Sequence, residues 1–112
     1  MRTIVILSLI CFFGFSGYGQ KTVKNISTPD TSKAIQVVEA SCGICQFGMS
    51  GSSCELAVRI DGKTYYVEGT KINDHGNAHG TNGFCNAVRK AEVQGAIVKN
   101  KYKVTYFKLL PE

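Results

Sequence analysis

The sequence lacks most of the patterns that assign a function directly. It has no internal repeat, no low-complexity segment and no Ser-His-acid arrangement in a recognisable context, so hydrolase chemistry is not favoured. No βαβ pattern surrounds its C-x-x-C motif, which argues against thioredoxin-like disulfide exchange. Histidine is scarce, with two residues against five cysteines. We therefore expect a binding protein and not an enzyme.

Long apolar runs are also missing. The N-terminal run Ile4–Phe15 is shorter than the roughly 20 apolar residues that span a bilayer. Arg2 precedes this run and small residues follow it up to Gly19, which is the pattern of a secretory signal peptide. We expect residues 1–19 to be removed, giving a secreted or periplasmic protein with no stable membrane anchor. A lipoprotein anchored through Cys11 is disfavoured, because the bulky Ile10 precedes Cys11 inside the apolar run.

The remaining chain divides into a polar segment and one small domain. Residues 20–33 are rich in Lys, Ser, Thr and Asn and show no apolar periodicity, so we interpret them as a flexible leader. Residues 34–112 form the predicted domain. Its lysines are spread evenly although the sequence pI is about 9.0, so nucleic acid is not an expected partner.

The domain is predicted to be mostly β. Apolar and β-branched residues, with alternation and turn signals, predict strands over 35–40, 54–60, 63–68, 92–98 and 102–110. Asp61-Gly62 is the strongest hairpin signal. The spacing of Phe84 and Val88 predicts a short helix over 84–90. This order predicts a small five-stranded OB-like barrel with one short helix between strands 3 and 4, in which Gly95 lets a strand bend.

The candidate site consists of six soft ligands between residues 42 and 85. Because antiparallel strands alternate in direction, these residues are predicted to converge at one pole of the barrel. Short spacings such as C-x-x-C and H-x-x-x-H allow two side chains to reach one ion. The six candidates are Cys42, Cys45, Cys54, His75, His79 and Cys85.

Three arrangements of these ligands remain open. Cys42 and Cys45 with His75 and His79 give a Cys2His2 metal site, with a Cys54–Cys85 disulfide beside it. The four cysteines alone give a four-thiolate site. Two disulfides give a stapled domain, with the histidines free or binding a metal weakly. For the first two arrangements we expect Zn or Cu, because both metals accept thiolate and imidazole donors.

Three blocks of the sequence carry a family resemblance: E-A-S-C-G-I-C-Q-F-G-M, C-E-L-A-V-R-I-D-G-K-T-Y-Y-V-E-G and D-H-G-N-A-H-G-T-N-G-F-C-N-A-V-R-K-A. Together they resemble a family of small secreted Bacteroidota proteins of unknown function, over Val37 to Pro111. The resemblance implies a periplasmic or outer-surface OB-like domain and brings no known activity. Two functions are expected on this basis: metal binding, or a disulfide-stapled module that binds a periplasmic protein or a small ligand.

Overall fold

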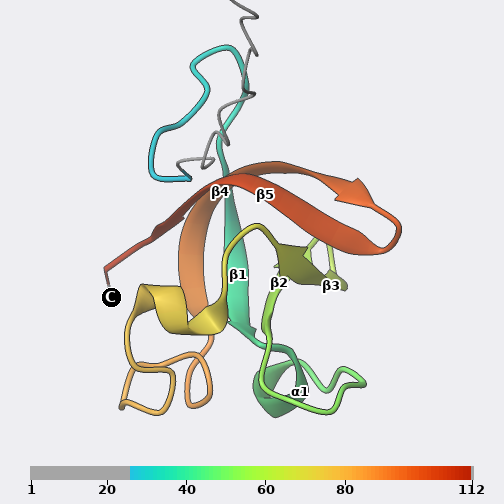
Figure 1. The fold of residues 1–112 in the computed structure, drawn as a ribbon, viewed down its shortest axis with the longest axis vertical. Coiled ribbons are helices and arrows are strands. Elements are labelled where there is room, and N and C mark those ends of the chain that lie inside the picture. Colours follow the sequence, from blue (N-terminus) through green and yellow to red (C-terminus); the bar gives the residue numbers. More distant parts are fainter. Residues whose placement is uncertain (1–25, 112) are drawn as a thin grey trace, which may run out of the picture.

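A computed structural model describes residues 26–111 as a closed five-stranded β-barrel (Figure 1). Around the barrel the strands follow the order β1-β2-β3-β5-β4, and all neighbours are antiparallel except β3 and β5, which are parallel. In chain order the elements are β1 Gln36–Cys42, α1 Gly43–Gln46, β2 Leu56–Ile60, β3 Lys63–Glu68, η1 Ile72–His75, β4 Arg89–Val98 and β5 Lys101–Leu109. The predicted mostly-β, five-stranded barrel is confirmed.

Turn chemistry sets the register of the two hairpins. Asp61 and Gly62 both have positive φ, at 50° and 80°, which matches the twist of a two-residue hairpin loop between β2 and β3. Lys99 and Asn100, with φ of 51° and 63°, make the corresponding turn between β4 and β5. Gly95 lies at a register shift in β4, and a Cβ there would collide with the carbonyl oxygen of Lys103. The expected bend at this glycine therefore has a steric cause.

The prediction of a helix between strands 3 and 4 is wrong. The short helix α1 lies between β1 and β2, and the segment between β3 and β4 holds only the 3-10 helix η1. Residues 84–88 form a turn and open loop, and Arg89 and Lys90 pair with Ala40 and Glu39 of β1. A seven-residue helix gains few internal hydrogen bonds, so pairing along β1 outweighs the weak helical periodicity.

Part of the predicted leader contacts the barrel. The side chain of Gln94 is buried, donates to the carbonyl oxygens of Asp30 and Lys33, and accepts from the N–H of Asp30. The N–H of Phe107 donates to the carbonyl oxygen of Ile26. These contacts satisfy a buried amide. The predicted signal peptide, with Cys11, lies outside the described residues. No helix among residues 26–111 has the length and apolarity needed to cross a membrane.

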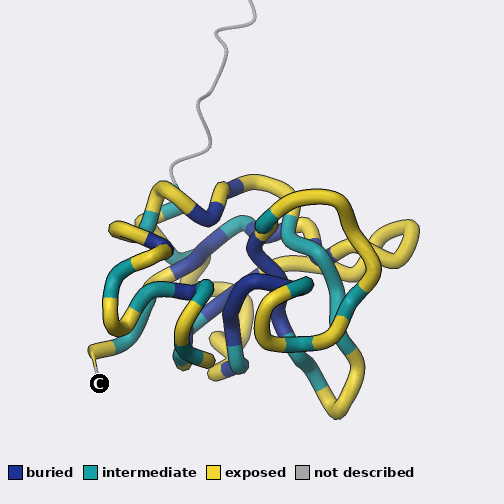
Figure 2. Tube along the Cα trace, turned by 90° about the horizontal axis from the view of Figure 1, so that it is seen from below, coloured by how far each residue is buried: buried dark blue, intermediate teal, exposed yellow. Residues whose placement is uncertain are grey.

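The core fills the barrel and extends to the end where β1 meets α1 (Figure 2). Leu56 and Val58 of β2 are buried, as their alternation predicts, and Ile60 packs against the same core. Phe84 closes this end from the segment before β4. Cys42, the last residue of β1, is fully buried and belongs to the core cluster. The rigid barrel therefore fixes the position of one candidate ligand directly.

Candidate metal centre

Four cysteines gather where β1 ends. Cys42 closes β1, Cys45 lies in α1, Cys54 precedes β2 and Cys85 lies in the turn before β4. Pairing of Cys42 with Leu56 places the start of β2 beside the end of β1, which explains how Cys54 reaches the same point. The predicted convergence at one pole thus holds for these four residues. We call them the thiol cluster.

The sulfur atoms of the thiol cluster have spacings that suit one metal ion. All four Sγ atoms lie within 4.8 Å of one another. The Sγ atom of Cys54 is 3.4 Å from that of Cys45 and 3.4 Å from that of Cys85. Four thiolates bound tetrahedrally to Zn²⁺ at about 2.3 Å have sulfur atoms about 3.8 Å apart. All four thiols are free, since a disulfide brings sulfurs to about 2.05 Å.

Backbone hydrogen bonds hold the strand end and the turn together. The N–H of Cys42 donates to the carbonyl oxygen of Phe84, and the hydroxyl of Ser41 donates to the same oxygen and to that of Ala87. The N–H of Cys85 donates to the carbonyl oxygen of Ala78. Because Ser41 and Phe84 are buried, these bonds are shielded from water. They fix the turn that carries Cys85 against the end of β1.

Gly43, inside the C-x-x-C motif, lets this segment pack closely against Tyr66 and Met49. A Cβ at Gly43 would lie 2.6 Å from the ring of Tyr66 and 3.0 Å from the sulfur of Met49. The hydroxyl of Tyr66 donates to the carbonyl oxygen of Ser50 and so anchors the loop between α1 and β2. The first residue of α1 is therefore a glycine for lack of space.

The thiols of the cluster differ in acidity. Burial raises the pKa of Cys42, but hydrogen bonds from the Cys54 and Cys45 thiols and from the backbone N–H groups of Cys45 and Ile44 outweigh it, so the pKa falls below its ordinary value of 9.0. Hydrogen bonds to Cys42 and Cys54 raise the pKa of Cys45 to about 12. Burial and a hydrogen bond to Cys54 raise that of Cys85 to about 11. Cys42 therefore loses its proton more readily than Cys45 and Cys85 do.

The two histidines lie apart from the four grouped sulfurs. The ring of His75 packs 4.4 Å from that of Phe107 and edge-on to that of Phe84, and its Nε2 lies 2.8 Å from the hydroxyl of Thr70. Burial lowers the pKa of His75, and the charge of Asp74 opposes that shift. His79 is exposed. Within residues 26–111 the group of metal-competent side chains contains cysteines alone.

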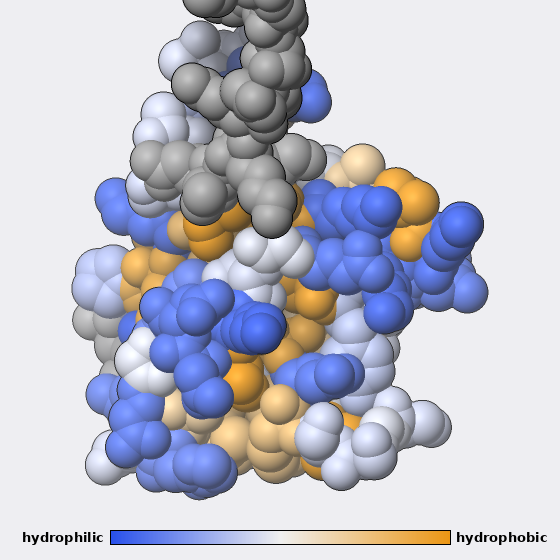
Figure 3. Space-filling model, viewed as in Figure 1, coloured by the Kyte–Doolittle hydropathy of each residue, from blue (hydrophilic) through white to orange (hydrophobic). Residues whose placement is uncertain are grey.

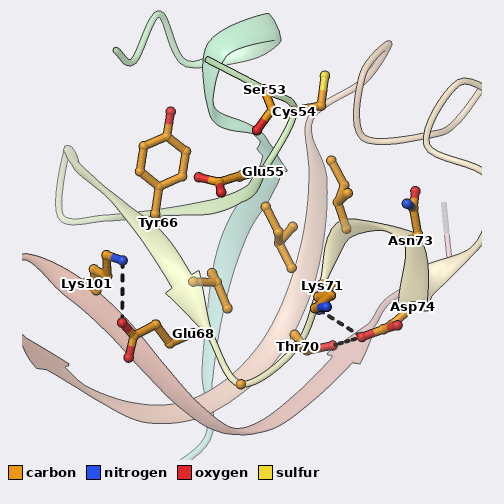
Figure 4. Close-up of a pocket in the computed structure, with 14 residues that line it drawn as sticks. Ser53, Cys54, Glu55, Tyr66, Glu68, Thr70, Lys71, Asn73, Asp74 and Lys101 are labelled. Carbon is orange, nitrogen blue, oxygen red and sulfur yellow. Dashed lines mark hydrogen bonds and ion pairs between the residues drawn. The ribbon is translucent and has the colours of Figure 1, made fainter. Parts of the chain in front are cut away.

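A cleft borders the thiol cluster, and no sequence pattern indicated it. The cleft has a volume of about 780 Å³, and Cys54 lines it. Leu56, Val67 and Ile72 form its apolar part, and Figure 4 labels its polar residues, Glu55 and Thr70 among them. Lys101 and Glu68 form an ion pair at its edge. The cleft is lined by residues of the loop before β2, of β3 and of the segment around η1. Because these segments are separated in the sequence, local sequence patterns do not predict the cleft.

Comparison with known proteins adds a family and no activity. No curated protein and no solved structure matches the chain significantly. A family model described as a family of unknown function, DUF6370, matches residues 36–110. The match runs from the first residue of β1 to just beyond β5, so it includes the whole barrel and all four cysteines of the thiol cluster. This chain therefore belongs to the DUF6370 family.

Proposed function

We propose that the protein binds one thiolate-preferring metal ion, Zn²⁺ or Cu(I), through the thiol cluster. The observation that carries the proposal is the grouping of all four Sγ atoms within 4.8 Å. It also favours the four-thiolate arrangement over the Cys2His2 arrangement that the spacing of the motifs suggested. We further propose that the protein acts in secreted or periplasmic form, as a binding protein without catalytic turnover.

Zinc suits the cluster best. Structural zinc sites are tetrahedral and closed, with four protein ligands, and thiolates are among their usual donors. The N–H groups of Ile44 and Cys45 that point at the Cys42 sulfur add the outer-layer hydrogen bonding that orients and stabilises a metal-bound thiolate. Cu(I) shares the preference for sulfur, and S4 sites also accept iron. Metal analysis therefore has to include all three elements.

The decisive experiment measures metal content and free thiols on protein purified without chelator or affinity metal. We expect about one metal ion per chain and all four cysteines of the thiol cluster reactive after unfolding. Exposed residues provide a matched pair of variants, Cys45→Ser and His79→Ala. Structural zinc sites supply about 10–16 kcal/mol, so one ligand of four contributes roughly 3 kcal/mol, or about a 100-fold change in affinity. We expect that loss for Cys45→Ser and none for His79→Ala.

The competing function is a disulfide-stapled module that binds a protein or a small ligand. The cleft beside Cys54 is the observation that favours it. Protein that contains no metal and no free thiols would overturn metal binding and leave this module as the function. Equal losses of metal affinity in Cys45→Ser and His79→Ala would instead restore the mixed cysteine and histidine site.

A further inference from the structure

Cys54 occupies a special position inside the thiol cluster. Its Sγ atom lies 3.4 Å from two different sulfurs, those of Cys45 and Cys85. Cys45 precedes Cys54 in the sequence and lies in α1, whereas Cys85 follows Cys54 and lies in the turn before β4. Either sulfur needs to move only about 1.4 Å toward Cys54 to reach bonding distance. Cys54 can therefore form a disulfide with either neighbour.

The four thiols differ in their access to solvent. Cys42 is fully buried, whereas Cys54 and Cys85 are half-buried and Cys45 is exposed. Cys54 also lines the cleft, whose volume of about 780 Å³ lies within the range of about 300–1,000 Å³ that small ligands occupy. Figure 4 places Cys54 at the end of the cleft, beside Ser53, with its sulfur directed away from the other lining residues. Because Cys54 is partly exposed at this end, a small molecule there can approach it, whereas Cys42 is out of reach.

The surface around the cleft suits a small molecule with an apolar centre. Figure 3 shows hydrophobic residues between hydrophilic flanks on the face that Figure 1 displays. Leu56, Val67 and Ile72 supply apolar lining, and Lys71 and Glu55 supply charges of both signs. A disulfide that carries polar or charged ends has this combination of an apolar S–S bond and hydrophilic termini.

We propose that the thiol cluster is also a two-electron redox centre, in which Cys54 reacts with a low-molecular-weight disulfide in the cleft and then forms an internal disulfide with Cys45 or Cys85. Release of a bound metal by this reaction rests on the proposed function, whereas the reaction itself does not. A Cys42–Cys45 disulfide within the C-x-x-C motif does not form in the first oxidation, because Cys42 is buried.

The reaction balances in two exchange steps. The Cys54 thiolate attacks one sulfur of the external disulfide, the external S–S bond breaks, and one external thiolate leaves. Cys45 or Cys85 then loses its proton and attacks the Cys54 sulfur, and the second external sulfur leaves as a thiolate that takes up a proton. Two thiols of the protein have become one disulfide, and the external disulfide has taken up their two electrons and two protons.

Oxidation and metal binding exclude each other at this site. The thiolate is the metal ligand, so a sulfur in a disulfide no longer serves. An internal disulfide at Cys54 removes two of the four thiolates together. The remaining pair cannot complete a tetrahedral S4 site, and the metal is released.

The experiment treats reduced protein with bis(2-hydroxyethyl) disulfide, once loaded with Zn²⁺ and once metal-free. Released 2-mercaptoethanol, released zinc and the positions of disulfides in unreduced peptides are measured by absorbance, a coloured chelator and mass spectrometry. We expect one internal disulfide per chain that always contains Cys54, and two released thiols. Cys45→Ser must form only the Cys54–Cys85 pair, and Cys85→Ser only the Cys45–Cys54 pair. Cys54→Ser must form an internal disulfide at least about ten-fold more slowly.

Each outcome decides between the alternatives. A Cys42–Cys45 disulfide in the unaltered protein, or a Cys54→Ser variant that reacts at the normal rate, overturns the proposal. If Cys54→Ser does not fold, the single pairs expected in Cys45→Ser and Cys85→Ser still decide it. Protein that forms the expected disulfides but never binds zinc would contradict metal binding and leave the redox centre in place. Protein that holds zinc without forming them sinks the redox centre alone.

Discussion

The thiol cluster and the segment that carries His75 and His79 begin as the same kind of sequence signal and become different structures. Both contain paired metal-binding residues at short spacing, next to glycines. In the fold, the cysteines meet within 4.8 Å, while His75 packs between aromatic rings and His79 faces solvent. Short spacing in the sequence places two ligands of one motif side by side. Whether a second motif lies close to the first depends on how the barrel positions the two segments.

The cause of the difference is how each segment is attached to the barrel. Cys42 is the last residue of β1, and Cys54 lies just before the paired residues of β2, so the sheet itself positions both sulfurs. His75 ends the 3-10 helix η1, where its ring completes the apolar packing around Phe84 and Phe107. A half-buried imidazole in that setting is a packing group. The difference between the thiol cluster and the histidine segment can be tested by measuring proton release on metal binding, the cost of tighter packing and the pH dependence of stability.

The largest expected difference is in the pH dependence of metal binding. Because the pKa values of Cys45 and Cys85 are about 12 and 11, both thiols hold protons near pH 7, and binding must release at least two protons. Zinc affinity should then rise about 100-fold per pH unit between pH 6 and 8. Competition titration with a chromophoric chelator at each pH measures the slope.

Two variants assign the protons to their residues. Cys85→Ser should reduce the slope by about one proton, and His79→Gln should leave it unchanged. The thiols titrate as an interacting group, so the slope reports the number of protons released by the whole cluster. The change in slope caused by a substitution reports the contribution of that residue. A slope that flattens above pH 6.5 would mean that imidazoles, which lose their protons there, supply the ligands.

The barrel could be predicted from the sequence because its signals are local. The β2 strand, the Asp61-Gly62 turn and the bend at Gly95 each depend on neighbouring residues, and each lies where the sequence pattern predicts. The helix over residues 84–90 was wrong because Arg89 and Lys90 pair with β1, about fifty residues earlier in the chain. The cleft and the grouping of the cysteines apart from the histidines depend on such long-range placement as well. The spacing of residues along the sequence predicts neither of these two features.

A second difference concerns how tightly the two regions are packed. Gly43→Ala places a methyl group 2.6 Å from the ring of Tyr66, so we expect a loss of about 1–3 kcal/mol in the free energy of unfolding. Gly80→Ala in the histidine segment meets only the carbonyl oxygen of Asn77, at 3.2 Å, and should cost less. Urea denaturation of metal-free, reduced protein measures both.

The double variant Gly43→Ala with Tyr66→Leu provides the control for this prediction. Leucine removes the ring that the new methyl group meets, so the cost of Gly43→Ala should shrink in that background. An unchanged cost would show that the contact with the Met49 sulfur, and not the packing of Tyr66, requires glycine. Equal costs for Gly43→Ala and Gly80→Ala would remove the difference in packing between the two regions.

The smallest expected effect is the contribution of His75 to stability. Burial lowers the pKa of His75 below 6.5 in the folded protein, so the unfolded chain binds a proton more readily. The contribution of His75 to the free energy of unfolding is complete above pH 6.5. It is lost as the pH falls through the pKa of His75 in the folded protein. Asp74, Asp30 and Glu39, whose pKa values lie below 3.8, 3.8 and 4.5, contribute their losses at lower pH. The window from pH 7 to 5 therefore isolates the imidazole.

His75→Gln keeps a polar group that can reach Thr70 and removes the titration, so its free energy of unfolding should change less over this window than that of the unaltered protein. His79→Gln is the matched control, because His79 is exposed, and it should keep the full pH dependence. Urea denaturation at several pH values, on metal-free protein, measures the three curves. If His79→Gln flattened the curve and His75→Gln did not, the packing role would belong to the other histidine. The distinction between a histidine in the core and a histidine in solvent would then be reversed.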